Sequence, residues 1–169
     1  DDPCVNPLAE RLIELDMPVL CHVFYKSTSQ LGDETRANHI RNLAERYPEL
    51  LARIREEGHG VGNHTYHHSR GCKSNTPKYL QDVEKANSIL HTSLFRPPHG
   101  RMRYAQKKAL QEAGYTIYLW DVLTHDYNPK YSAEHMLAVV NRYTRNGSII
   151  TLHDSLKSKN RMLKALPLI

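Results

Sequence analysis

Two histidines four residues apart are the side chains of this sequence best suited to chemistry. His64 and His68 lie in the run His-Thr-Tyr-His-His, directly after Gly-Val-Gly-Asn. Two imidazoles and one carboxylate form an open zinc site, in which one position stays available for water or substrate. The spacing alone proves little, because the chain holds 11 histidines in 169 residues. His67 is the main alternative donor, and a histidine-rich loop that binds no metal is the other alternative.

Several polar motifs accompany this pair, and their order along the chain strengthens the case for a metal site. They are Asp1-Asp2 at the start, Arg96-Pro97-Pro98-His99-Gly100 in the middle, then Trp120-Asp121, Asp126-Tyr127 and Leu152-His153-Asp154. Each motif alone has an ordinary explanation: a solvated terminal pair, a surface turn, or a structural histidine on a strand. Their occurrence together favours a catalytic site.

This ordered set resembles the motifs of the NodB-type polysaccharide deacetylases, carbohydrate esterase family four. The family pattern runs Thr-Phe-Asp-Asp-Gly, His-Thr/Ser-x-x-His, Arg-x-Pro-Tyr or Arg-Pro-Pro-Tyr-Gly, Asp-Trp and Leu-x-His. The resemblance extends over residues 47–169 and is weaker in residues 1–46, where Pro3 replaces the glycine after the aspartate pair. It implies an α/β fold, a distorted (β/α) barrel of about seven parallel strands.

The resemblance implies that one divalent ion binds to Asp2, His64 and His68. Zn²⁺ is the expected ion, and Co²⁺ or Ni²⁺ are alternatives that such a donor set accepts. Two neutral imidazoles and one carboxylate leave a net charge of about +1, enough to polarise a carbonyl and activate a water.

The resemblance also assigns the groups that handle the attacking water. Asp1 is expected to be the general base, because proton abstraction requires a carboxylate within hydrogen-bond reach. Arg96 is expected to pair with Asp1, since a fixed guanidinium keeps a carboxylate ionised and oriented. His99 stands where the family has tyrosine, and its backbone N–H is expected to help stabilise the oxyanion.

Asp126 and His153 are expected to act as the acid pair. In the family the late histidine protonates the leaving amine, and the aspartate favours the imidazolium form of that ring. Two further residues are expected to contact the substrate. Tyr127 stands where the family has tryptophan, a wall of the sugar groove. Thr151 stands where a leucine cradles the acetyl methyl, which makes the expected pocket more polar.

Apolar runs and helix-ending residues predict an alternation of strands and helices. Strands are expected at 18–24, 60–63, 94–97, 115–120 and 148–153, and helices at 48–57, 76–90, 104–113 and 132–145. Thr76 is the expected N-cap of the second helix, with Pro77 at its first helical position, and Ser132 is the expected N-cap of the fourth.

Strands separated by helices are expected to pair in parallel through right-handed crossovers. The candidate residues come at or just past the ends of expected strands: His64, Arg96, Asp126 and His153. In a parallel barrel those strand ends meet on one rim, where active sites are built. Independent structural histidines would have no reason to share that placement.

Length and composition bound the class of protein. A chain of 169 residues with 40% hydrophobic and 24% charged residues predicts one soluble globular domain over residues 1–169. No apolar run approaches the roughly 18 residues that a membrane helix needs. Cys4, Cys21 and Cys72 form no spacing motif, so buried or free thiols are expected. Both ends are expected to be trimmed, since the aspartate pair should follow a strand and residues 162–169 resemble an interrupted helix.

The formal net charge of +5 is spread along the chain. No run of five or more basic residues occurs and aromatic residues are not interleaved with the basic ones, so a nucleic-acid-binding face is not expected. A mild positive field could attract an anionic polymer such as a cell-wall glycan. A solvated surface without a partner is the alternative.

The sequence therefore predicts metal-dependent hydrolysis of acetyl groups, N-acetyl groups above all, from a carbohydrate polymer such as peptidoglycan or a chitin-like oligosaccharide. The alternative is a catalytically impaired carbohydrate-binding pseudoenzyme on the same fold. A zinc peptidase is disfavoured, because no His-Glu-x-x-His motif is present. The sugar, the native metal and the oligomeric state stay open. The implied function is compatible with action outside the cytoplasm or at the cell envelope, although no signal peptide begins this chain.

Overall fold

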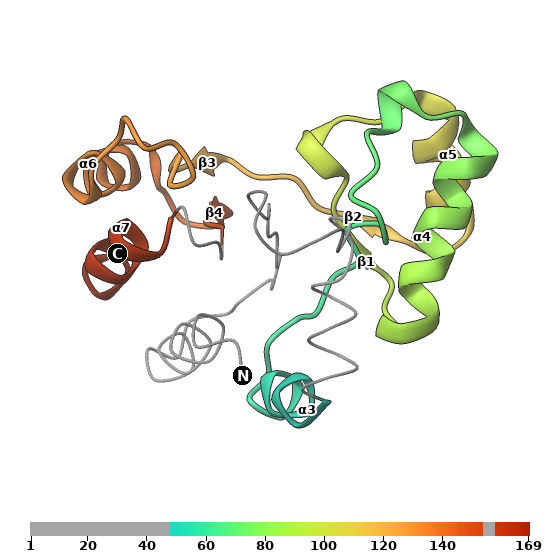
Figure 1. The fold of residues 1–169 in the computed structure, drawn as a ribbon, viewed down its shortest axis with the longest axis horizontal. Helices are drawn as coiled ribbons and strands as arrows, with labels where there is room; N and C mark the ends of the chain where they lie inside the picture. The colour runs from blue at the N-terminus through green and yellow to red at the C-terminus, as the bar shows by residue number, and fades with distance from the viewer. Residues whose placement is uncertain (1–47, 154–157) are drawn as a thin grey trace, which may run out of the picture. The chain divides into compact units, whose positions relative to one another are not determined.

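Figure 1 shows the computed structural model of this chain, which describes residues 48–153 and 158–169. The described residues belong to two compact units. Residues 48–119 form the N-terminal unit, and the residues from 120 onward form the C-terminal unit. The predictions that lie outside the described residues concern Asp1, Asp2, Cys4, Cys21 and the strand at 18–24.

The four predicted helices are present at nearly the predicted positions, and a fifth follows near the end. They are α3 (Pro48–Glu56), α4 (Thr76–Leu90), α5 (Tyr104–Glu112), α6 (Ala133–Tyr143) and α7 (Lys159–Ala165). Gly58 and Gly114, which follow α3 and α5, both have a φ angle of +85°. Glycine adopts this left-handed conformation without steric strain, so the two predicted helix ends are confirmed.

Polar side chains fix two of the helix starts. Asn75 Oδ1 accepts a hydrogen bond from the backbone N–H of Lys78 at 2.9 Å. Ser132 Oγ accepts one from the backbone N–H of His135 at 3.2 Å, which confirms Ser132 as an N-cap. The prediction of Thr76 as the other N-cap is wrong, because Thr76 is already helical and Asn75 caps it. Both residue types cap helices well, so the pattern alone does not separate two adjacent candidates.

The N-terminal unit contains one parallel strand pair. The strands β1 (Leu94–Phe95) and β2 (Thr116–Ile117) pair in parallel, with α5 between them in the chain. Asn63 adds a parallel bridge to Phe95, so the strand expected at 60–63 contributes its last residue only. The predicted parallel pairing through a helical connection is confirmed here.

The C-terminal unit contains a second parallel pair, β3 (Val122–Leu123) and β4 (Ile150–Thr151), with α6 between them in the chain. The prediction of one strand over 115–120 is wrong in its bounds, and β3 was not predicted. Asp121 interrupts the apolar run, and its carboxylate accepts a hydrogen bond from the backbone N–H of Ile149 at 2.9 Å. Within the described residues the strands form two separate two-stranded parallel sheets and no closed barrel.

The core of the N-terminal unit lies where α4 and α5 pack beside the β1–β2 pair (Figure 1). Tyr79, Val83, Phe95 and Leu110 are almost fully buried there. The rings of Tyr79 and Phe95 meet edge to face, with centroids 6.3 Å apart. Burial of a large apolar side chain stabilises a fold by about 1.5–3 kcal/mol. This core therefore holds the end of β1, and the residue that follows it, in place.

The core of the C-terminal unit lies between α6 and α7. Its buried members are Ala133, Met136, Met162, Ala165 and Leu166. The expected interrupted helix at the end of the chain is the second half of α7 followed by a 3₁₀ turn over Leu166–Leu168. None of the helices that the structure describes is long and apolar enough to cross a membrane.

Gly71 allows two segments of the N-terminal unit to approach each other closely. A Cβ atom at this position would lie 2.7 Å from Gln106 Oε1 and 2.8 Å from Met102 Cα. Both separations are shorter than any ordinary van der Waals contact, and Met102 Cα belongs to the main chain, which cannot rotate away. The segment that enters α4 and the segment that enters α5 therefore touch at a position that only glycine fits.

We predict that Gly71→Ala lowers the free energy of unfolding by about 1–3 kcal/mol, because the added methyl group overpacks this contact. Gly60→Ala is the matched control, since its added methyl meets only Leu94 Cδ1, the end of a side chain that can rotate, at 3.2 Å. Denaturant unfolding of both variants measures the difference. Equal stability of the two variants would contradict the close approach.

Candidate functional site

Asn63 fixes the start of the loop that carries the predicted metal-binding histidines. Its backbone N–H donates to Leu94 O at 2.8 Å, and its carbonyl accepts from the Arg96 N–H at 2.9 Å. Its fully buried side chain donates to Val83 O at 2.9 Å and accepts from the Thr65 N–H at 2.9 Å. One residue thus joins the loop to β1 and to α4, which positions the side chain of the next residue.

The His64 ring has a defined tautomer. Its Nδ1 lies 2.5 Å from the carbonyl oxygen of Arg96. A carbonyl oxygen only accepts hydrogen bonds, so Nδ1 carries the hydrogen and Nε2 carries the lone pair. This arrangement is typical of metal-binding histidines, whose second nitrogen donates to a carbonyl or carboxylate. His64 is also buried, which holds its ring in one orientation.

His68 lies beside His64, as the predicted metal site requires. Their ring centroids are 4.9 Å apart and the rings are tilted by 53°. Two imidazole nitrogens about 2 Å from one ion in tetrahedral geometry place their ring centroids about 5 Å apart. The pair therefore fits a shared ion. His68 has a φ of +51°, an uncommon conformation for a residue other than glycine, of the kind that clusters at functional sites.

No three His, Cys, Asp or Glu side chains of the described residues form a group that could hold a metal ion. The third predicted ligand, Asp2, lies outside these residues. The alternative donor His67 is turned to a different partner, because its Nδ1 contacts the carboxylate of Asp82 on α4. Its backbone N–H also donates to both oxygens of that carboxylate, at 3.2 Å each.

Arg96 directly follows β1 and is buried, with 5% of its surface exposed. Its guanidinium donates to Leu119 O at 3.3 Å, and among the described residues its Nε has no hydrogen-bond partner. Burial lowers the pKa of Arg96 from its usual range, but arginine still carries its charge near neutral pH. A buried cation with an unused donor is stable only beside an anion. The predicted partner, Asp1, lies outside the described residues.

His99 joins the same cluster from the turn after β1. Its ring centroid lies 4.8 Å from that of His68, and its Nε2 accepts a hydrogen bond from Arg70 Nε at 3.2 Å. Desolvation lowers the pKa of His99, and the Arg70 guanidinium lowers it further. The ring is therefore neutral near neutral pH. The main chain of His99 has a φ of +58°, a second left-handed residue at this cluster.

In the C-terminal unit Asp126 and His153 form the predicted pair. Asp126 Oδ1 lies 2.8 Å from His153 Nδ1, and Oδ2 accepts from the His153 backbone N–H at 2.6 Å. Asp126 is fully buried. One carboxylate therefore holds both the main chain and the ring of the same histidine. Because the carboxylate accepts from Nδ1, this nitrogen carries a hydrogen and the orientation of the ring is fixed.

Two residues that the sequence analysis did not select support this pair. Arg161 of α7 donates to the Asp126 carbonyl from Nε and from a terminal nitrogen, at 3.1 and 2.8 Å. Thr124 Oγ1 lies 3.3 Å from Asp126 Oδ1 and 3.0 Å from the Thr151 carbonyl. Neither residue belongs to a motif, and both reach the pair only through tertiary contacts, so no sequence signal marks them.

The two predicted substrate contacts also lie near His153. The Tyr127 ring stands edge-on to the His153 ring, with centroids 4.9 Å apart, and 41% of Tyr127 is exposed. Partial desolvation and the nearby Asp126 raise the pKa of Tyr127, so its hydroxyl stays protonated. Thr151 is buried at the end of β4, and its hydroxyl has no hydrogen-bond partner among the described residues.

Comparison with known proteins places these observations in a family. Residues 35–118 match the family model described as polysaccharide deacetylase. A peptidoglycan-N-acetylglucosamine deacetylase of Bacillus cereus is 33% identical over 118 residues, which are 66% of this chain and 42% of that protein. The chain thus spans less than half the length of this relative.

Solved structures show the same likeness. A crystal structure of a peptidoglycan N-acetylglucosamine deacetylase has a TM-score of 0.66 and 26% identity, and the match covers 86% of this chain and 78% of that chain. A carbohydrate esterase family four pseudoenzyme from Bacillus anthracis has a TM-score of 0.70. At 17% identity over 96% of this chain and 54% of that one, the second likeness shows the fold alone.

We predict that Arg70→Gln raises the pKa of His99, because removal of a nearby cation favours the protonated ring. An NMR titration of the His99 ring measures this shift. Arg70→Lys is the control, and it should leave the pKa close to the wild-type value since the positive charge is kept. A lower pKa in Arg70→Gln would show that the guanidinium does not act on this ring as described.

Proposed function

The chain belongs to the NodB-type polysaccharide deacetylases, carbohydrate esterase family four, and we propose that it hydrolyses acetyl groups on a carbohydrate polymer. N-acetyl groups of peptidoglycan or of a chitin-like oligosaccharide are the proposed targets, because two of the similar proteins are named peptidoglycan N-acetylglucosamine deacetylases. The proposal includes a distorted barrel of about seven parallel strands. The observation that carries it is the paired placement of His64 and His68, with the His64 tautomer set for a metal.

We propose that Asp2, His64 and His68 hold one divalent ion, Zn²⁺ before Co²⁺ or Ni²⁺. When bound, such an ion supplies Lewis acidity toward a carbonyl and a water. The support is the fit of two imidazoles to one tetrahedral ion and the hydrogen bond from His64 Nδ1 to the Arg96 carbonyl, which fixes the orientation of the ring.

Different residues of the chain then remove the proton of the water and stabilise the developing negative charge. Asp1 takes a proton from the attacking water, and Arg96 keeps that carboxylate ionised and oriented. The backbone N–H of His99 donates to the oxygen that becomes negative as water adds to the acetyl carbon. Support for the Arg96 role is its buried guanidinium, whose Nε has no acceptor among the described residues.

His153 completes the reaction by giving a proton from Nε2 to the nitrogen as the carbon–nitrogen bond breaks, which releases acetate and a free amine. Asp126 orients the ring through Nδ1, in the manner of a carboxylate that fixes a catalytic histidine. Tyr127 forms a wall against the sugar, and the buried Thr151 hydroxyl offers the acetyl group a polar contact.

We predict that His64→Ala and His68→Ala each lose the bound metal and release no acetate from N-acetylated chitin oligosaccharide. His67→Ala is the matched control, because its ring contacts Asp82 and should not affect metal content. Elemental analysis of purified protein and an acetate assay give the two measurements. Full metal occupancy in both the His64 and the His68 variant would contradict the assignment of these two histidines as metal ligands. Full occupancy without acetate release by the wild type would favour the carbohydrate-binding pseudoenzyme.

We also predict that His153→Ala slows hydrolysis of an acetamide substrate by about 10²-fold or more, since the amine leaves poorly without a proton. An activated acetyl ester should lose much less, because its leaving group departs as an anion. His125→Ala is the control, because the His125 ring contacts Tyr127 and takes no part in the hydrogen bond between Asp126 and His153. Rates on both substrates test this, and equal losses on amide and ester in His153→Ala would remove the acid role.

A further inference from the structure

Two segments of the N-terminal unit carry many basic residues and no acidic residue. They are residues 70–78, which lead into α4, and residues 98–108, which lead into α5. Their cations are Arg70, Lys73, Lys78, Arg101, Arg103, Lys107 and Lys108. All seven are exposed. In the sequence these residues look scattered, because 19 residues separate the two segments.

The fold brings the two segments into contact. Gln106 Nε2 donates to Gly71 O at 3.0 Å and to Ser74 O at 3.2 Å. Arg103 donates to Cys72 O at 3.1 Å, and the close approach at Gly71 adds a third contact. The two segments therefore lie side by side in the N-terminal unit, and we call their seven exposed cations together the cationic face.

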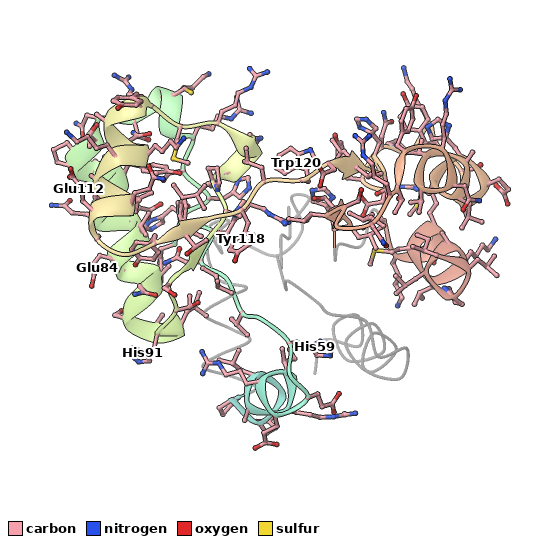
Figure 2. All side chains as sticks on the ribbon, turned by 180° about the vertical axis from the view of Figure 1, so that it is seen from behind. His59, Glu84, His91, Glu112, Tyr118 and Trp120 are labelled. Atoms are coloured by element: carbon pink, nitrogen blue, oxygen red, sulfur yellow. The ribbon has the colours of Figure 1, made fainter. Side chains whose placement is uncertain are left out.

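Little within the described residues neutralises the cationic face. Of its seven cations only Lys108 has an ion pair there, with Glu112 at 3.8 Å. The helices α4 and α5 also begin beside these cations, near the top of the N-terminal unit in Figure 1. His91, which follows the last residue of α4, lies at the opposite end of that helix in Figure 2. Each helix N-terminus adds the equivalent of roughly half a positive charge. The local potential therefore favours an anion.

An exposed aromatic side chain lies within the cationic face. Tyr104 is the first residue of α5 and 80% of its surface is exposed, the highest value among the large apolar side chains that the structure describes. Tyrosine is enriched in binding surfaces, because its ring offers apolar area and its hydroxyl a polar handle. The cationic face thus combines charge with a ring on which another molecule can rest.

The cationic face is continuous with the histidine cluster. Arg70 Nε donates to His99 Nε2 at 3.2 Å, and the His99 ring lies against the His68 ring, with centroids 4.8 Å apart. A polymer bound at the cluster can therefore extend over the cationic face. This link favours a glycan over any unrelated anionic partner.

We propose that the cationic face binds a glycan substrate whose sugars carry carboxylate groups, so that the protein selects acidic over neutral acetylated glycans. This inference rests on the proposed function, because it names the class of that same substrate. Exposed cations attract an anionic polymer through forces that salt screens over about 10 Å at 0.1 M. The preference should therefore weaken as salt concentration rises.

The test compares two soluble chitin derivatives, carboxymethyl chitin, which is anionic, and glycol chitin, which is neutral. The variant Lys73→Gln/Arg101→Gln/Lys107→Gln removes three cations of the face whose side chains make no hydrogen bond or ion pair within the described residues. The matched control, Lys130→Gln/Arg142→Gln/Arg145→Gln, removes three exposed cations of the C-terminal unit. Dissociation constants at about 50 and about 300 mM salt and acetate release from both polymers are measured on the full chain.

We expect the wild type and the control to bind carboxymethyl chitin about tenfold or more tighter than glycol chitin at low salt, with the gap closing at high salt. The face variant should lose most of this preference while still releasing acetate from glycol chitin. The inference would be overturned if the control variant lost the preference equally, or if the wild type bound the two polymers equally well. It would also be overturned if the wild type bound single-stranded DNA more tightly than carboxymethyl chitin, in a salt-dependent way and through the same three residues. Absence of acetate release from both polymers would instead contradict the proposed function.

Discussion

The main-chain contact between Asn63 and Arg96 is the constraint on which the N-terminal cluster depends. It joins the histidine loop to the end of β1, and the Arg96 carbonyl then accepts from the His64 ring. This short stretch of backbone thus fixes the position of the His64 ring and the nitrogen that carries its hydrogen. It also holds Arg96 where its guanidinium is buried. Because the core between α4, α5 and β1 fixes Phe95, these features are set by packing rather than by the loop itself.

In the C-terminal unit, too, hydrogen bonds at the end of a strand fix the position of a histidine ring. Two short parallel strands place Asp126 and His153 just past their ends, and the buried carboxylate binds both the ring and the main chain of the histidine. Arg161 satisfies the Asp126 carbonyl from α7. A buried carboxylate is stable only when its acceptor sites are used, so the supporting hydrogen bonds and the chemistry have a common cause.

Prediction from sequence succeeded where the signal was local. Glycines at helix ends, the Ser132 cap and the placement of Arg96 and His153 after strands follow from the conformational preferences of neighbouring residues. It failed where two local signals compete, as for Thr76 against Asn75, and at β3, where the polar Asp121 interrupts the apolar run. A strand as short as β3 exists because a partner pairs with it, and pairing is not encoded in a local pattern.

The sequence by itself determined the candidate residues, their order and the parallel α/β character of the chain, because motif spacing and apolar periodicity are properties of neighbours along the chain. The tertiary structure decided the partners. It turned His67 toward Asp82, set His99 beside His68 and Arg70, and joined two basic segments into the cationic face. Electrostatic and hydrogen-bond energies depend on distance in space, and residues far apart in sequence acquire that distance only when the chain folds.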